Sequence, residues 1–199
     1  MRDRLPGALM AALVLWLWGA AFSPAAARFL LSDGSFGAGY LGPLETPSPL
    51  AFMAMVGLWA GQMKGSAVWQ LPCAAVVAAT AAAVLGRLGV MLPYAGHGAA
   101  VGLVALGAAV AVAARVPLSL AVAGVAVGAV FHGYGQAGLA NHWPLALFHI
   151  LGSLCGFVLI VAAGVGMTVI VTGRAAAPAV RIAGVSGLAL GCAILSGYW

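Results

Sequence analysis

The sequence predicts an all-α membrane protein, a polytopic bundle of transmembrane helices. Of its 199 residues, 64% are of hydrophobic types and only 6% are charged. A soluble domain carries about 25% charged residues, so this chain lies far outside the globular range. A spanning helix needs about 20 apolar residues, and the length therefore has room for roughly seven or eight such helices and none for a soluble catalytic domain.

Apolar runs that end at charges, prolines or glycine clusters define the expected helices. They fall at about 6–27, 49–63, 66–86, 97–114, 117–134, 144–172 and 179–198. The last six runs are the core spans of a predicted membrane domain over residues 49–199. Residues 28–48 are expected to form an external loop. This loop and the connection 135–143 have enough polar atoms to host chemistry.

The first segment, residues 1–27, has two interpretations. Basic residues at Arg2 and Arg4, an apolar stretch and small residues ending at Ala27 are typical of a cleavable signal peptide. The same run is long enough to be a retained seventh span. Both alternatives leave six core spans with the same orientation.

The positions of the charges predict the topology and argue against two classes of protein. With the N-terminus inside, six of the 8 Lys and Arg residues lie on the cytoplasmic side, and only Arg28 and Arg87 lie outside. These cations are scattered singly, so the sequence lacks the basic cluster that binding to nucleic acid requires. It also lacks a nucleophile motif, and its three carboxylates all lie within the first 45 residues. We therefore expect no enzyme activity.

The expected topology brings the histidines near the external face. His97, His132 and His142 lie there together with Glu45, and imidazole and carboxylate groups suit Ni²⁺ or Co²⁺. These four residues are the candidate metal ligands. Each histidine also has a structural interpretation, as a ring that bonds a backbone group or sits in the wet interface. His149 lies deeper, and it either bonds a neighbouring helix or is a cofactor-binding ligand to a haem-type or chlorophyll-type metal.

Several short stretches point to a known family. They read Phe36-Gly-Ala-Gly-Tyr-Leu-Gly-Pro43, Ala54-Met-Val-Gly-Leu-Trp-Ala60, Leu71-Pro72, Leu92-Pro93, Arg115-Val-Pro117 and Phe131-His-Gly-Tyr134. In this order the chain resembles the HupE/UreJ family of hydrogenase and urease accessory proteins, from Phe36 to its end. The resemblance implies a nickel or cobalt permease of the bacterial inner membrane, made with a cleavable leader. Its site is then expected on the periplasmic side.

The first metal signature of that family is mostly replaced here. The family reads His-Pro-x-x-Gly-x-Asp-His-x-x-x-Met, and this chain reads Gly-Pro-Leu-Glu-Thr-Pro-Ser-Pro-Leu-Ala-Phe-Met over residues 42–53. Proline and methionine are kept. The two histidines and the aspartate are replaced by Gly42, Pro49 and Ser48, none of which is a strong ligand.

The second signature is also eroded. The family's approximate Phe-His-Gly-Tyr-Ala-His-Gly-x-Glu keeps only His132 as a ligand, with Gln136 and Leu139 in place of the second histidine and the acid. A further family acid falls at about Gly96. The resemblance therefore implies a preserved scaffold around a dismantled site.

Two functions remain open. One is a divergent Ni/Co permease in which His132 works with His97, His142 and Glu45 as a relocated ligand set. The other is a non-transporting structural or assembly subunit of a larger membrane protein complex. Both place the chain in a lipid bilayer, and the second adds other membrane subunits as partners.

Overall fold

The computed structural model of the chain describes residues 35–136, 143–170 and 176–197, and the regular structure in these ranges is entirely helical. This confirms the all-α fold. The helices are α3 (Ser35–Glu45), α4 (Pro47–Met63), α5 (Ala67–Arg87), α6 (Ala95–Ala111), α7 (Leu118–Tyr134), α8 (Trp143–Ile170) and α9 (Ala176–Leu195). The first apolar segment lies outside the described residues.

Three helices are long and apolar enough to cross a membrane. The stretches that meet this criterion are Ala67–Arg87, Ala146–Thr168 and Pro178–Leu195, in α5, α8 and α9. The apolar helices α6 and α7 have 17 residues each, or about 25 Å at the usual rise per residue. Membrane residence is thus supported by the three longer helices, while the number of six core spans stays a prediction.

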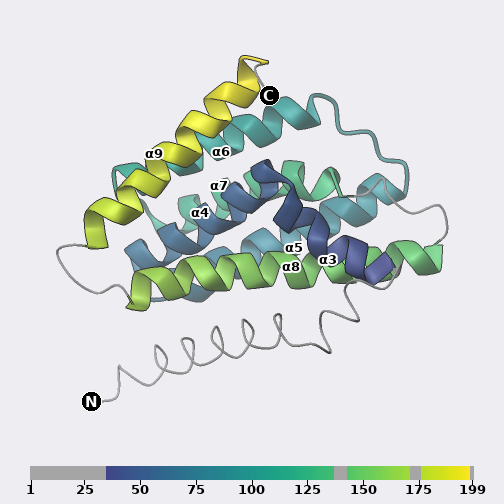
Figure 1. Cartoon of the computed structure of the whole chain (residues 1–199), viewed down its shortest axis with the longest axis horizontal. Helices are drawn as coiled ribbons and strands as arrows, with labels where there is room; N and C mark the ends of the chain where they lie inside the picture. The colour runs from purple at the N-terminus through teal and green to yellow at the C-terminus, as the bar shows by residue number, and fades with distance from the viewer. Residues whose placement is uncertain (1–34, 137–142, 171–175, 198–199) are drawn as a thin grey trace.

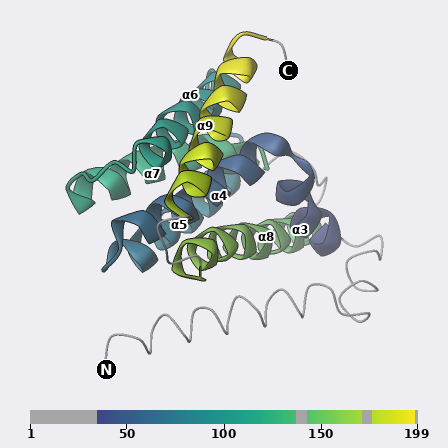
Figure 2. The same ribbon diagram turned by 60° about the vertical axis from the view of Figure 1, so that its left-hand side comes forward.

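The central element of the bundle is α4, which contacts every other helix in the described part of the chain. Figures 1 and 2 show α8 and α3 on one side of it, and α6 with α9 on the other. The helices α5 and α7 pair with each other, as do α6 and α9. Two-sided coverage explains why α4 is buried around most of its circumference, from Phe52 to Gly61.

The relative directions of the helices follow from their glycine contacts. A side chain at Gly57 would meet Val161, and one at Gly61 would meet Thr168, so α4 runs parallel to α8. By the same reasoning α6 and α9 are antiparallel. Gly107 of α6 faces Leu188 of α9, whereas Ala111, later in α6, faces Gly184, earlier in α9. This alternation is what successive crossings of one membrane require.

Helix α3 occupies part of the region expected to be a loop. Residues 28–48 are expected to form an external loop, and within them Ser35–Glu45 is helical and packs along α8. A Cβ atom at Gly39 would collide with the backbone of His149, and one at Gly152 would collide with the backbone of Phe36. Such close backbone approach stabilises helix pairs in membranes. The contact with α8 therefore stabilises α3 as a helix, which its glycines would otherwise disfavour.

A single residue separates α3 from α4. Thr46 has an extended conformation, with φ −96° and ψ 114°, as expected for a residue that precedes a proline. Its backbone N–H and its hydroxyl both donate to the carbonyl of Gly42, at 3.1 and 2.8 Å. Pro47 then begins α4, a position where proline is favoured because the first helical N–H needs no helical partner. The chain therefore bends at Thr46 and directs α4 into the centre of the bundle.

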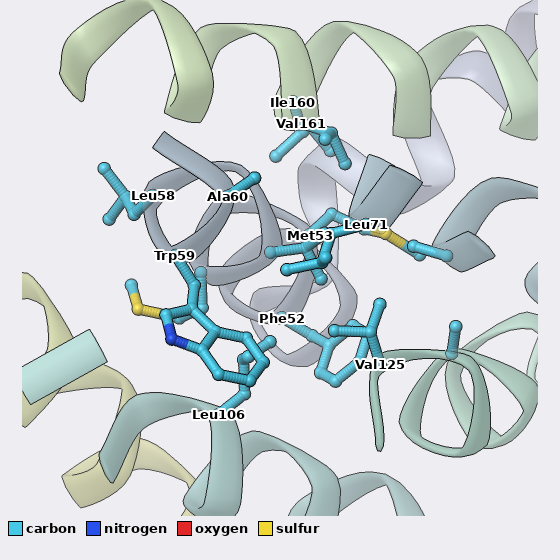
Figure 3. Packing of buried hydrophobic residues seen from close by; sticks show 14 of the residues in the cluster. Phe52, Met53, Leu58, Trp59, Ala60, Leu71, Leu106, Val125, Ile160 and Val161 are labelled. Atoms are coloured by element: carbon cyan, nitrogen blue, oxygen red, sulfur yellow. The ribbon is translucent and has the colours of Figure 1, made fainter. Parts of the chain in front are cut away.

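The apolar core is built around α4. Figure 3 shows Ile160 and Val161 of α8 on one side of this helix, and the rings of Phe52 and Trp59 pointing to the other side. There they meet α6 and α7, which contribute the buried residues Leu106 and Val125, respectively. Because lipid provides no hydrophobic driving force between helices, these interdigitated side chains stabilise the bundle through van der Waals contact.

Candidate functional site

A cavity of about 390 Å³ lies at one end of the bundle, where α3 breaks into α4, α6 begins and α7 ends. Its walls come from these elements and from the end of α9. The lining residues are Gly42, Thr46, Pro47, Ser48, Pro49, Ala95, Gly96, Ala99, Phe131, His132, Gly135, Gln136 and Ile194.

His132 is the histidine that lines this cavity. It sits in the last turn of α7 and is only 4% exposed. Its ring stacks on Phe52 and is hydrogen-bonded to the backbone of Ala99. The Nε2 atom is buried and has no hydrogen-bond partner among the described residues. When Nδ1–H donates to a backbone carbonyl, Nε2 keeps its lone pair and is available as a ligand atom.

Gln136 supplies a second buried polar atom. It follows His132 by four residues, its backbone N–H donates to the carbonyl of Gly133 at 3.0 Å, and it is 7% exposed. Its Oε1 atom is buried without a partner in the part of the chain that the structure describes. A Cβ atom at Gly42 would lie 3.1 Å from this oxygen, so glycine there leaves room for the amide. Gly42 thus brings α3 close to the polar end of α7.

The break between α3 and α4 makes this cavity rich in acceptors. The last turn of a helix presents carbonyl oxygens and the negative end of its dipole, and α3 ends at Glu45 beside the cavity. At the start of α4, Pro47 and Pro49 have no N–H to donate. Among the described lining residues there is no carboxylate. The C-terminal ends of α3 and α7 therefore offer acceptors to a ligand that brings positive charge or hydrogen-bond donors, while α4 and α6 begin at the same cavity.

The other predicted metal ligands do not join His132 in this cavity. His97 lies on an exposed part of α6, with its ring 6.2 Å from that of Tyr94 between centroids. Glu45 is exposed at the end of α3. Neither residue is among those that line the cavity, and His142 lies outside the described residues. Within the described ranges, no three His, Cys, Asp or Glu side chains come together as a metal centre.

His149 is buried in the contact between α8 and α3. It is 4% exposed, and its backbone carbonyl lies against Gly39. The neighbouring Ser153 also faces α3, and its hydroxyl donates to the carbonyl of Gly39 at 3.0 Å. This is a helix-packing environment, which matches the structural interpretation of His149. Its role as a cofactor ligand stays a prediction.

Comparison with known proteins identifies the family. The family model described as HupE / UreJ protein matches residues 12–194. The chain belongs to the HupE/UreJ family. It is 30% identical over 168 residues to Protein HupE of Rhizobium leguminosarum bv. viciae, which covers 84% of this chain and 87% of that relative. No solved structure matches.

Because the chain belongs to the HupE/UreJ family, the cavity can be compared with the metal signatures that the sequence analysis describes. The positions at which the sequence resembles the family's metal signatures converge on it, although they come from three separate parts of the chain. They are Gly42, Ser48, Pro49, Gly96, His132 and Gln136. The remaining motif position, Leu139, lies outside the described residues. The fold therefore gathers in one place the positions that the sequence analysis relates to the family's metal signatures.

Gln136 is the site residue that the sequence reasoning did not select. In the family signature this position is a histidine, whereas here the structure buries the amide oxygen of Gln136 and places the residue in the wall of the same cavity as His132. Its closeness in sequence to His132 was the available signal, since Gln136 lies in the turn that follows the last residue of α7.

Proposed function

We propose that this protein is a divergent nickel or cobalt permease of HupE/UreJ type, and that the ion enters at the cavity formed by His132 and Gln136. The observation that carries the proposal is a pair of buried atoms, Nε2 of His132 and Oε1 of Gln136, which have no hydrogen-bond partner among the described residues and belong to two residues that line this cavity. In native proteins a buried polar atom is normally satisfied. An entering cation satisfies both of these atoms.

The chemistry of the two donors agrees with such an ion. Imidazole nitrogen suits Ni²⁺ and Co²⁺, and an amide oxygen is a weaker, harder donor. Two protein donors do not complete the shell of either ion, so the remaining positions stay with water or with backbone carbonyls of the α3 break. The result is weak binding, which favours passage because an ion must also leave its site.

The proposed direction of entry follows from topology. The positive-inside rule puts the C-terminal end of α7 on the outer side of the membrane, and His132 lies in its last turn. In a bacterial inner membrane this is the periplasmic side. Discontinuous helices such as α3 and α4 are the usual setting of ion sites in transporters, where half-helix carbonyl ends face the cation.

The test is metal binding by purified protein and metal uptake into vesicles that contain it. His132→Ala is expected to weaken Ni²⁺ or Co²⁺ binding about tenfold or more, as the loss of a metal-site residue does, and to lower uptake in parallel. His97→Ala is the matched control, because that histidine is exposed and does not line the cavity. Calorimetry that shows no metal binding by the unmutated protein, together with no uptake, contradicts the proposal.

A second candidate function is a non-transporting subunit of a larger membrane protein complex. It is favoured by one observation, that no group of three metal-binding side chains forms within the described residues. This function predicts that purification in mild detergent recovers other membrane proteins in fixed stoichiometry, and that vesicles with this chain alone take up no metal. A chain that transports metal without partners excludes it.

A further inference from the structure

A second, smaller cavity lies further along α4. Its volume is about 130 Å³, and it is lined by Phe52, Trp59, Gly102, Ala105, Leu106, Ala109, Gly124 and Val125. We call it the inner cavity, and the one at His132 the outer cavity. Phe52 and Trp59 are seven residues apart, which places them on the same face of α4 two turns from each other. Figure 3 shows their rings on this common side.

The ring of Phe52 lies between the two cavities. It is 1% exposed, it lines the inner cavity, and it stacks on His132, which lines the outer one. Its opposite contacts are with glycines. A Cβ atom at Gly128 would lie 2.7 Å from the ring, and one at Gly102 would lie 3.6 Å from it. The glycine at position 128 therefore creates the space in which this ring closes the passage.

Polar groups return beyond the inner cavity. Gln62, ten residues after Phe52, donates its amide N–H to the carbonyl of Val110 at 3.0 Å. Its Oε1 atom is buried and lacks a partner among the residues described. Ten residues correspond to about 15 Å along the helix. Buried acceptors thus lie on both sides of Phe52, at His132 and Gln136 near one end of α4 and at Gln62 near the other, with an aromatic ring and an apolar cavity between them.

We propose that the Phe52 side chain is the gate of the ion path, closed in this structure between the outer and the inner cavity. This inference rests on the proposed transport function. An apolar constriction excludes a hydrated ion because water and charge are unfavourable there. Passage then requires the ring to leave its place between His132 and Gly128, and the inner cavity, which the ring already lines, offers space for such a rotamer change.

Thiol labelling tests the gate without requiring any transported ion. The three native cysteines, Cys73, Cys155 and Cys192, are replaced by alanine, and Leu106→Cys supplies one thiol in the wall of the inner cavity. A small, positively charged, membrane-impermeant methanethiosulfonate is then added to right-side-out membrane vesicles. With Phe52 present we expect slow labelling, because the thiol reacts only during rare openings.

The variants decide the outcome. Phe52→Ala is expected to accelerate labelling at least about tenfold by abolishing the need for such an opening, while Phe52→Leu keeps an apolar barrier and stays slow. Phe52→Val replaces the alanine variant if the latter does not fold. Fast labelling in the presence of Phe52, or equal rates with Phe52 and Phe52→Ala, overturns the gate.

A matched control separates gating from general loosening of the core. Phe157 on α8 is also buried, at 2% exposure, but it lines neither cavity. Phe157→Ala is expected to leave the labelling rate unchanged, and an equal acceleration by this variant overturns the gate. Metal uptake distinguishes the two proposals. If the vesicles take up metal but the labelling rate does not depend on Phe52, the gate is wrong and the transport function stands. If the labelling rate depends on Phe52 but the vesicles take up no metal, the transport function is wrong.

Discussion

The imidazole of His132 stacks on the phenyl ring of Phe52, with centroids 4.3 Å apart and ring planes inclined by 28°. This contact joins the last turn of α7 to the middle of the bundle. Together with the contact to the backbone of Ala99, it holds the imidazole in the wall of the outer cavity. In the proposed mechanism the ligand and the gate are therefore neighbours, and a cation that pulls on Nε2 acts directly on the ring that blocks its path.

The first prediction restores a ligand to the outer cavity. Gln136→His places a second imidazole in the wall of the cavity that His132 already lines. We expect Co²⁺ or Ni²⁺ affinity to rise about tenfold or more, since each added first-row metal ligand of this type strengthens the site. Titration of the purified variant with CoCl₂ measures the change.

The control for this prediction is a histidine elsewhere on the same helix. Ser119→His adds an imidazole to the opposite end of α7, at an exposed position, and is expected to leave the high-affinity phase unchanged. If Ser119→His and Gln136→His strengthen binding equally, the added imidazole acts nonspecifically and the cavity is not a metal site.

The second prediction concerns the contact between α3 and α8. In Gly152→Ala the new methyl group would collide with the backbone of Phe36, so the helices must separate. We expect a loss of about 1–3 kcal/mol in the free energy of unfolding, as for other overpacked contacts. Thermal unfolding in detergent measures it. Gly124→Ala is the control, because its Cβ meets nothing within 4 Å and alanine is the better helix former by up to about 1 kcal/mol. Equal melting temperatures for the two variants contradict this packing.

The third prediction tests the hydrogen bond that ties the same two helices. The hydroxyl of Ser153 is buried and donates to the carbonyl of Gly39, whereas the hydroxyl of Ser186 is exposed and donates within its own helix to Ile182. We expect Ser153→Ala to destabilise the fold by about 0.6 kcal/mol, typical of interhelical bonds in membranes. Ser186→Ala should have no measurable effect. The unfolding curves of both variants are compared with that of the unmutated protein. A larger loss of unfolding free energy for Ser186→Ala than for Ser153→Ala contradicts the role of the bond between Ser153 and Gly39.

The apolar runs of the sequence predict the long helices closely. The expected runs 66–86 and 117–134 correspond to α5, Ala67–Arg87, and α7, Leu118–Tyr134. These boundaries follow from local signals, such as Pro117 before α7 and the glycines after it. Helix α3 could not be predicted in this way. Its stability depends on backbone approach between α3 and α8, a tertiary contact that leaves no periodic pattern in the sequence.

For the site, the sequence predicts which end of a helix carries a histidine, but it does not predict which way the side chain faces. His132 and His97 were both expected near the external face, but only His132 lines the cavity. On α6 the side chain of His97 is exposed, whereas Ala99, two residues after it, lines the cavity. A helix rotates by about 100° per residue. Which residue faces inward therefore depends on how α6 packs, and no local property of the sequence fixes that.

The last prediction concerns the far end of the proposed path, where Trp59 closes the inner cavity. Its indole Nε1–H donates to the carbonyl of Ala114 at 2.9 Å, in a turn where the preceding Ala113 has φ 51°, a conformation that non-glycine residues rarely adopt. Trp59→Phe removes this donor and is expected to reduce the free energy of unfolding by about 0.5–1.5 kcal/mol. Trp69→Phe is the control, because that side chain is 59% exposed and its loss should be within about 0.5 kcal/mol of neutral. Thermal unfolding in one detergent compares the variants, and an equal loss for both means that the bond to Ala114 does not hold the end of α6 to α4.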